Sequence, residues 1–201
     1  PGGPREGSDF QNLHRNKRAI ALNLKADRGR ALFFRLVAGA DVVVENMRAD
    51  VKHRLGVDYE ACAAVNPRIV YGSISGFGQD GPYGPRAGVD QIAQGLGGLM
   101  SITGLPGQGP VRVGVPIADL SAGLYLAIGL LVALLERDRP DGSGRGQWVH
   151  TSLIESIVEV DEELMMKYFE GEEPSQEQLD SLIEHAVAHG TLVPIMCCSA
   201  K

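Results

Sequence analysis

The predicted fold rests on residues 18–45, which read RAIALNLKADRGRALFFRLVAGADVVVE. Residues 18–24 form an apolar run of strand length, residues 27–40 place apolar side chains at helical spacing, and residues 41–45 form a second apolar run. Asp27 is the expected N-cap of the helix. A strand, a helix and a strand in this order are typical of a βαβ unit, which builds a parallel sheet. We therefore predict an α/β protein.

The alternation of helices and strands continues towards the middle of the chain. The longest apolar stretch, residues 120–135, predicts a buried helix, because it is shorter than the ~20 residues that span a bilayer. We therefore expect no membrane segment. The remaining expected elements of this part are a helix at 59–65, a strand at 68–74, a helix at 89–100, a strand-like stretch at 110–117, a turn at 138–147 and a strand at 148–152.

Residues 76–88 are too rich in glycine and proline for a regular element and predict a shaped loop. The loop is either a simple connection or part of a binding site, since long loops that follow strands in α/β proteins often contact ligands. Gly76, Gly78 and Gly81 match the spacing of a dinucleotide-binding motif. However, Pro82 directly after Gly81 prevents the loop from running straight into a helix, so we reject that motif.

Composition indicates a soluble globular protein, with 44% hydrophobic and 22% charged residues among 201 and a net charge of −6. Acidic residues are concentrated in residues 155–184, which argues against a nucleic-acid partner. The three cysteines, Cys62, Cys197 and Cys198, have neither disulfide nor metal-ligand spacing. We therefore expect no metal and a reducing compartment, the cytoplasm.

Asp119 is the carboxylate most suited to chemistry. It follows an apolar run and stands at the start of the long apolar helix. One interpretation is a helix N-cap, a position that aspartate favours. The other is a nucleophile, because a partly desolvated carboxylate can attack an activated carbonyl and form a covalent acyl intermediate. The two roles are compatible.

Five spaced motifs resemble family III CoA-transferases, the group that includes formyl-CoA transferase and carnitine CoA-transferase. They lie at residues 15–20 (RNKRAI), 45–48 (ENMR), 73–82 (SISGFGQDGP), 95–104 (GLGGLMSITG) and 142–147 (GSGRGQ). Their order is that of the family. The resemblance covers residues 1–155 and implies the large domain of such an enzyme, an incomplete Rossmann-like core with a parallel sheet.

The resemblance also implies a reaction and a set of contacts. Asp119 matches the family's catalytic aspartate, whose carboxylate attacks the acyl-CoA thioester and becomes a mixed anhydride. Coenzyme A leaves, and a carboxylic acid acceptor takes over the acyl group. Coenzyme A, as part of the acyl-CoA substrate, is the implied ligand. The family's CoA contacts correspond to Leu22, Lys25, Asn46, Met47 and Arg54.

Two departures from the family pattern shape the expectation. Val89 stands where related acyl-CoA racemases carry a histidine that moves the α-proton, so racemase chemistry is disfavoured. Family members also begin earlier and continue into a second domain, and they form interlocked homodimers. The alternative function is therefore an inactive truncated or chimeric fragment that binds CoA weakly, and such a fragment is expected to expose apolar surface.

Residues 156–201 resemble a fragment of the GTPase domain of elongation factor G, a mostly helical piece joined to the transferase part near Glu155. The resemblance lies in residues 158–165, 167–172 and 193–201. The P-loop and the guanine-reading motif of a GTPase are not in this sequence, so GTP binding is not expected. The pattern predicts helices at 161–169 and 176–189 and a strand at 191–196.

Overall fold

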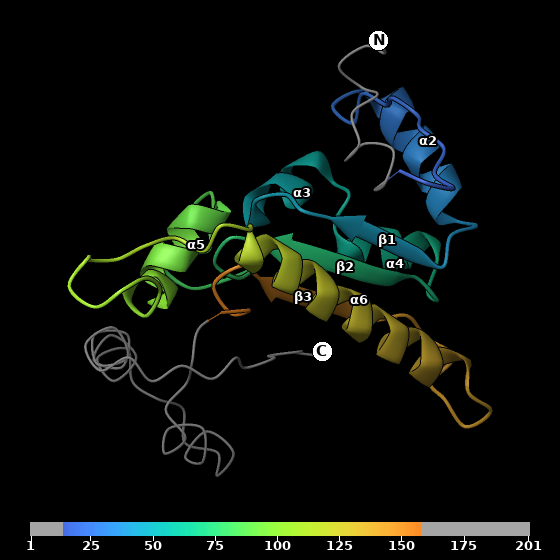
Figure 1. Cartoon of the computed structure of the whole chain (residues 1–201). Coiled ribbons are helices and arrows are strands. Elements are labelled where there is room, and N and C mark those ends of the chain that lie inside the picture. Colours follow the sequence, from blue (N-terminus) through green and yellow to red (C-terminus); the bar gives the residue numbers. More distant parts are fainter. Residues whose placement is uncertain (1–13, 158–201) are drawn as a thin grey trace.

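A computed structural model describes residues 14–157. The elements expected at 161–169, 176–189 and 191–196 lie outside these residues. Within them the α/β prediction is confirmed. Three parallel strands, in the order β1, β2, β3, form one sheet with helices on both faces (Figure 1). The strands are β1 (Val42–Glu45), β2 (Val70–Ser75) and β3 (Trp148–Ser152).

β2 is the central strand, and nearly all of its residues are buried. Val42 of β1 lies opposite Val70, and Trp148 of β3 lies opposite Tyr71. Helices α2 (Asp27–Val37) and α4 (Tyr59–Val65) contribute to a core cluster on one face of the sheet, around Tyr71. Such a strand, covered on both faces, is typical of parallel sheets in α/β proteins.

The opposite face of β2 is covered by α6 (Ile117–Asp138). A stripe of mostly small residues lets the helix approach the sheet closely, with Leu126 packed against Val70 and Val149. The stripe consists of Ala118, Ala122, Leu126, Gly129, Ala133 and Arg137.

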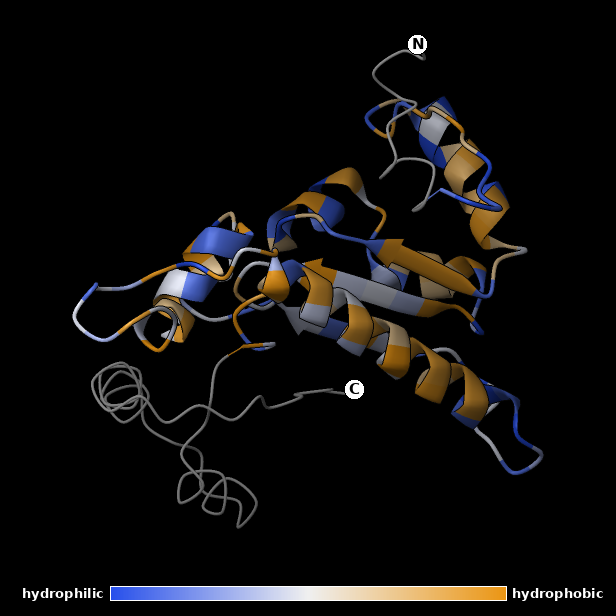
Figure 2. Ribbon diagram, in the orientation of Figure 1, coloured by the Kyte–Doolittle hydropathy of each residue, from blue (hydrophilic) through white to orange (hydrophobic). Residues whose placement is uncertain are grey.

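The prediction that this helix is buried holds for one face only. The outward face of α6 carries exposed apolar side chains, and most of the helix is apolar in Figure 2. In residues 14–157, α6 is the helix whose length and hydropathy would suit a membrane span, but core helices of α/β proteins share these properties. The exposed apolar residues of this face are Leu120, Leu124, Ile128, Leu131, Val132 and Leu135.

Two predicted strands are wrong. Residues 18–24 are irregular and mostly exposed, and residues 110–117 pair with no strand in the described part of the chain. An apolar run becomes a strand only where a neighbouring strand offers hydrogen bonds, and β1 has β2 as its one partner here. The peptide N–H of Lys25 instead bonds the Asn23 side chain in a tight turn.

Several predicted boundaries also change. Ala26, rather than Asp27, is the N-cap of α2, which ends at Val37. The helix expected at 89–100 is divided into α5 (Asp90–Leu96) and the short 3-10 helix η1 (Leu99–Ser101). Gly98 adopts a positive φ of 78° between them, a conformation that ends the helix and that glycine adopts without strain.

The helix expected at 59–65 and the strand expected at 148–152 are confirmed by α4 and β3. A further short helix, α3 (Ala49–Leu55), was not predicted. The loop at 76–88 returns on itself. Gly76 and Gly88 meet so closely that a Cβ on Gly76 would lie 2.4 Å from the Gly88 Cα. Any larger side chain at these two positions would force the ends of the loop apart.

We predict that the two faces of α6 respond differently to the same substitution. Leu126→Ala removes a side chain that is 3% exposed, so it should lower the free energy of unfolding by about 2–5 kcal/mol. Leu124→Ala is the matched control, because this side chain is 66% exposed and should contribute less than about 1 kcal/mol. Urea unfolding measures both. Equal losses would show that the outward face of α6 is covered in solution.

Candidate active site

The first turn of α6 lies at the carboxyl ends of the strands. Just after β3, the Ser156 hydroxyl donates to the Ala118 carbonyl at 3.2 Å. At the other end of the helix, the Arg137 guanidinium donates to the Arg68 carbonyl at 2.8 Å and to the Asp41 carboxylate at 3.0 Å, before β2 and β1 begin. This orientation places Asp119 at the edge where parallel α/β sheets bind their ligands.

Asp119 does not cap α6, which corrects one of the two sequence interpretations. It is the third residue of the helix, and the N-cap is Pro116. The carboxylate of Asp90 takes the capping role from α5, because its Oδ1 accepts a hydrogen bond from the Ala118 N–H at 2.9 Å. Nothing in residues 14–157 therefore requires the Asp119 carboxylate for a cap, and its side chain stays exposed.

The pKa of the Asp119 carboxyl is raised above its ordinary value. Partial desolvation at the helix start is the larger cause, and the negative charge of Asp90 is the second. The Asp119 residue as a whole is exposed, so the loss of hydration is limited to part of its carboxyl surroundings. A carboxylate with a raised pKa is more basic and is a better nucleophile than an ordinary aspartate.

The turn after β1 carries two of the predicted CoA contacts at the same edge of the sheet. Asn46 is exposed and Met47 is half-buried. The turn is held by the last residue of β1, since the Glu45 carboxylate accepts a hydrogen bond from the Met47 N–H at 2.6 Å. Glu45 is itself buried, so its charge needs a partner.

Lys52 of α3 supplies that partner. Its ammonium lies 3.3 Å from Glu45 Oε1, with the Lys52 and Glu45 side chains 0% and 5% exposed. The same ammonium donates to the Gln79 side chain in the loop at 76–88 and lies 5.4 Å from the centre of the Trp148 ring. One buried cation therefore joins the turn after β1, the loop after β2 and strand β3.

The other predicted contacts are less closely grouped. Arg54 lies on α3, exposed, with its guanidinium 3.3 Å from the Asp50 carboxylate. Leu22 and Lys25 precede α2, and no hydrogen bond or ion pair among residues 14–157 joins them to Asn46 or Asp119. The structure thus places Asn46, Met47 and Asp119 at the carboxyl edge, Arg54 in the last turn of α3, and Leu22 and Lys25 before α2.

Sequence reasoning missed the residues that support this site. Lys52 and Gln79 are 27 positions apart, and of the two only Gln79 lies in a family motif, the one at 73–82. Glu45 belongs to the quoted motif at 45–48, so that motif was a usable signal. Asp90 and Gln94 stand four residues apart on one helix, a spacing that puts both side chains on the same face. Their target, however, lies on a different element.

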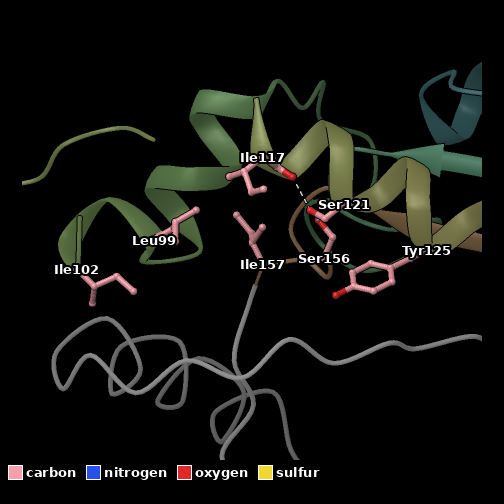
Figure 3. Close-up of a pocket in the computed structure, with 7 residues that line it drawn as sticks. All are labelled: Leu99, Ile102, Ile117, Ser121, Tyr125, Ser156 and Ile157. Atoms are coloured by element: carbon pink, nitrogen blue, oxygen red, sulfur yellow. Dashed lines mark hydrogen bonds between the residues drawn. The ribbon is translucent and has the colours of Figure 1, made fainter. Parts of the chain in front are cut away.

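A hollow of about 380 Å³ lies near the first turns of α6 (Figure 3). Because a helix turns about 100° per residue, Asp119 lies about 200° around α6 from both Ile117 and Ser121, which line the hollow. The hollow therefore lies on the flank of the helix away from Asp119. Its remaining lining residues are Leu99, Ile102, Tyr125, Ser156 and Ile157.

One group of possible metal ligands occurs in the described part of the chain. It comprises His53 of α3, Asp58 and Glu60, near the start of α4. The carboxylate of Asp58 is already engaged as the N-cap of α4, where it accepts from the Ala61 N–H at 3.0 Å. His53 and Glu60 are exposed, and such surface groups are common without an ion.

Comparison with known proteins identifies relatives of this chain. The family described as CoA-transferase family III matches residues 2–191. Succinate–glutarate CoA-transferase of Agrobacterium fabrum is 42% identical over 158 residues, which cover 75% of this chain and 39% of that protein. Succinyl-CoA:glutarate CoA-transferase of Mus musculus is 35% identical over 196 residues, covering 98% of this chain and 43% of the mouse protein.

A solved structure shows the same fold. The crystal structure of a CAIB/BAIF family protein from Brucella suis superposes with a TM-score of 0.64 at 39% identity, covering 79% of this chain and 42% of that one. The chain thus spans about two fifths of the length of the curated relatives it matches.

The matches also bear on residues 156–201. The family match continues to residue 191, and the alignment with the mouse enzyme covers nearly the whole chain. These comparisons give no support to the resemblance of this segment to elongation factor G, and the domain boundary near Glu155 stays a prediction. From the parallel sheet, the ordered motifs and these matches, it follows that the chain belongs to CoA-transferase family III.

Proposed function

We propose that this chain carries the nucleophile of a CoA-transferase that exchanges coenzyme A between an acyl-CoA and a carboxylic acid. The observation that carries the proposal is the position of Asp119, an exposed carboxylate with a raised pKa at the carboxyl edge of the sheet. Membership of the CoA-transferase family supports the reaction class.

In the proposed first step, a carboxylate oxygen of Asp119 attacks the carbonyl carbon of the thioester. The C–S bond breaks, coenzyme A leaves as its thiolate, and the acyl group is joined to Asp119 as a mixed anhydride. No proton is transferred in this step, so the enzyme needs a deprotonated Asp119 and no general base. The rate should therefore fall as the pH drops through the raised pKa of Asp119.

The proposed coenzyme A contacts are Leu22, Lys25, Asn46, Met47 and Arg54. Exposed cationic side chains such as Arg54 suit the phosphates of coenzyme A. The turn at Asn46 and Met47 is fixed by the buried Glu45 carboxylate, so it needs little ordering when a ligand binds. The loop at 76–88 is joined to the ion pair of Glu45 and Lys52, because the Lys52 ammonium donates a hydrogen bond to the Gln79 side chain of the loop.

For the acceptor we infer a dicarboxylic acid, because the Agrobacterium and mouse relatives are named for succinate and glutarate. The alternative function is a CoA-binding fragment without turnover. Binding and covalent chemistry therefore have to be measured separately.

We predict a covalent adduct on Asp119. The protein is incubated with succinyl-CoA and then with hydroxylamine, which converts an aspartyl anhydride to a hydroxamate detectable by peptide mass spectrometry. Asp119→Asn should abolish both the adduct and the release of thiol, because an amide is a poor nucleophile. Asp141→Asn is the matched control, since Asp141 lies in the exposed turn before β3, and it should behave like the unchanged protein.

An adduct that persists in Asp119→Asn would disprove the assigned nucleophile. Calorimetric binding of coenzyme A without any adduct in the unchanged protein would establish the binding fragment instead.

We also predict that two cations of α3 contribute in opposite ways. Lys52→Met leaves the Glu45 carboxylate buried without a counter-charge and should cost about 3–5 kcal/mol of unfolding free energy. Arg54→Met removes an exposed ion pair with Asp50 and should cost less than about 1 kcal/mol. Arg54→Met should nevertheless weaken CoA binding by about tenfold or more, since a charged hydrogen bond to phosphate is lost.

Urea unfolding and calorimetric titration with coenzyme A measure the two effects. Equal stability losses would contradict the role of Lys52, and unchanged CoA affinity in Arg54→Met would remove Arg54 from the proposed contacts.

A further inference from the structure

Two buried polar side chains of α5, Asp90 and Gln94, connect that helix to the segment in front of Asp119. Asp90 is 9% exposed and Gln94 is 0% exposed. They are joined to each other, because the Gln94 Nε2 donates to the Asp90 Oδ2 at 2.6 Å. In Figure 1, α5 lies beside the first turn of α6, and Ala93 of α5 packs in one cluster with Ala118.

Each of the two side chains also holds the backbone that leads into α6. The Asp90 Oδ1 accepts from the Ala118 N–H at 2.9 Å. The Gln94 Oε1 accepts from the Val113 N–H at 2.8 Å, and its Nε2 lies 3.5 Å from the Val115 carbonyl. The segment is thus fixed at both ends, five residues apart, by one pair of side chains.

Helix capping alone does not require this arrangement. A serine or asparagine at position 116 would cap α6 without burying a charge. Instead Pro116 offers no side-chain cap, and a largely buried carboxylate from another helix takes its place. The positive end of the α6 dipole favours a negative charge there. The same charge lies close enough to Asp119 to raise its pKa.

We propose that Asp90 and Gln94 form a clamp that fixes the backbone of residues 113–118 and thereby positions the Asp119 carboxylate. Both are positioning residues, because they act through the backbone and touch no reacting atom. The proposal rests on the assignment of Asp119 as the nucleophile. Asp119 is the residue directly after the clamped Ala118, so its Cα and side-chain direction follow from the clamped backbone.

The donor and acceptor pattern of the clamp provides a sharp test. In Asp90→Asn, the new amide NH2 faces the NH2 group of Gln94, so two donors meet. If the Gln94 amide turns over, its NH2 group faces the Val113 N–H instead, and two donors meet there. In Gln94→Glu, two carboxylates face each other. The double variant Asp90→Asn with Gln94→Glu restores the pattern at Val113, at Ala118 and between the two side chains, and it loses only the 3.5 Å contact with the Val115 carbonyl. The new amide at position 90 then donates to the new carboxylate at position 94, and that carboxylate still accepts from the Val113 N–H.

The first measurement is amide hydrogen exchange of Val113 and Ala118 in the whole chain by NMR. Each single variant should exchange at these two amides at least about tenfold faster, as expected for the loss of a hydrogen bond to a charged or buried partner. The double variant should return to within about threefold of the unchanged protein. Gln91→Glu is the matched control, because Gln91 is exposed on the same helix, and it should change neither amide.

The second measurement is the pH titration of the Asp119 carboxyl carbon. Among residues 14–157, Asp90 is the charged neighbour to which the Asp119 pKa responds, so Asp90→Asn should lower the midpoint. This shift follows from the charge of Asp90 alone, so it tests the proximity of the two carboxylates, whereas the rate of hydroxamate formation at Asp119 tests the positioning. An unchanged midpoint, or a double variant that exchanges as fast as the single variants, overturns the proposal.

Neither measurement needs turnover, so the clamp and the proposed function can fail separately. If the variants show the expected exchange and titration but the unchanged protein forms no hydroxamate at Asp119, the clamp is supported and the nucleophile assignment fails. If the hydroxamate forms equally fast in Asp90→Asn and in the unchanged protein, the clamp does not position Asp119, and the inference is wrong.

Discussion

The packing of α6 against the central strand β2 is the constraint on which the rest of the structure depends. A parallel strand between two neighbours has two faces to cover. Helix α6 covers one of them with a stripe of mostly small residues, which lets the helix lie close to the sheet. The Arg137 guanidinium fixes the far end of the helix at the amino edge of the sheet. The near end, with Asp119, is thereby brought to the carboxyl edge, beside α5 and the segment after β3.

Buried charges are concentrated at that same edge. Glu45, Lys52 and Asp90 are all largely withdrawn from water, although burying a charge is costly unless it is paired. Glu45 and Lys52 neutralise each other, whereas Asp90 is stabilised by the start of α6 and by Gln94. Glu45 and Asp90 each accept a hydrogen bond from a backbone N–H, one beside a proposed ligand contact and one beside Asp119, the proposed nucleophile. The proposed site therefore depends on main-chain segments held by polar side chains.

The outward face of α6 is not part of the proposed site. It carries several leucine side chains that are exposed in the described part of the chain. The hollow near Ser121 lies on the flank of α6 away from Asp119 and ends at Ile157, the last described residue. Both surfaces lie away from the flank of α6 that carries Asp119.

The sequence by itself determined the α/β class, helix α4, strand β3 and the motifs of the family, because these depend on local periodicity and on residue spacing. Asp119 was identified as the candidate nucleophile because it follows an apolar run and stands at the start of a long apolar helix, which the local sequence shows. Only the tertiary structure decided that residues 18–24 and 110–117 are not strands, since a strand requires a partner that local pattern does not supply. It also decided that Asp90 rather than Asp119 caps α6 and that Lys52 supports the turn after β1. These contacts join residues 28 and 7 positions apart, where packing, rather than periodicity, chooses the partner.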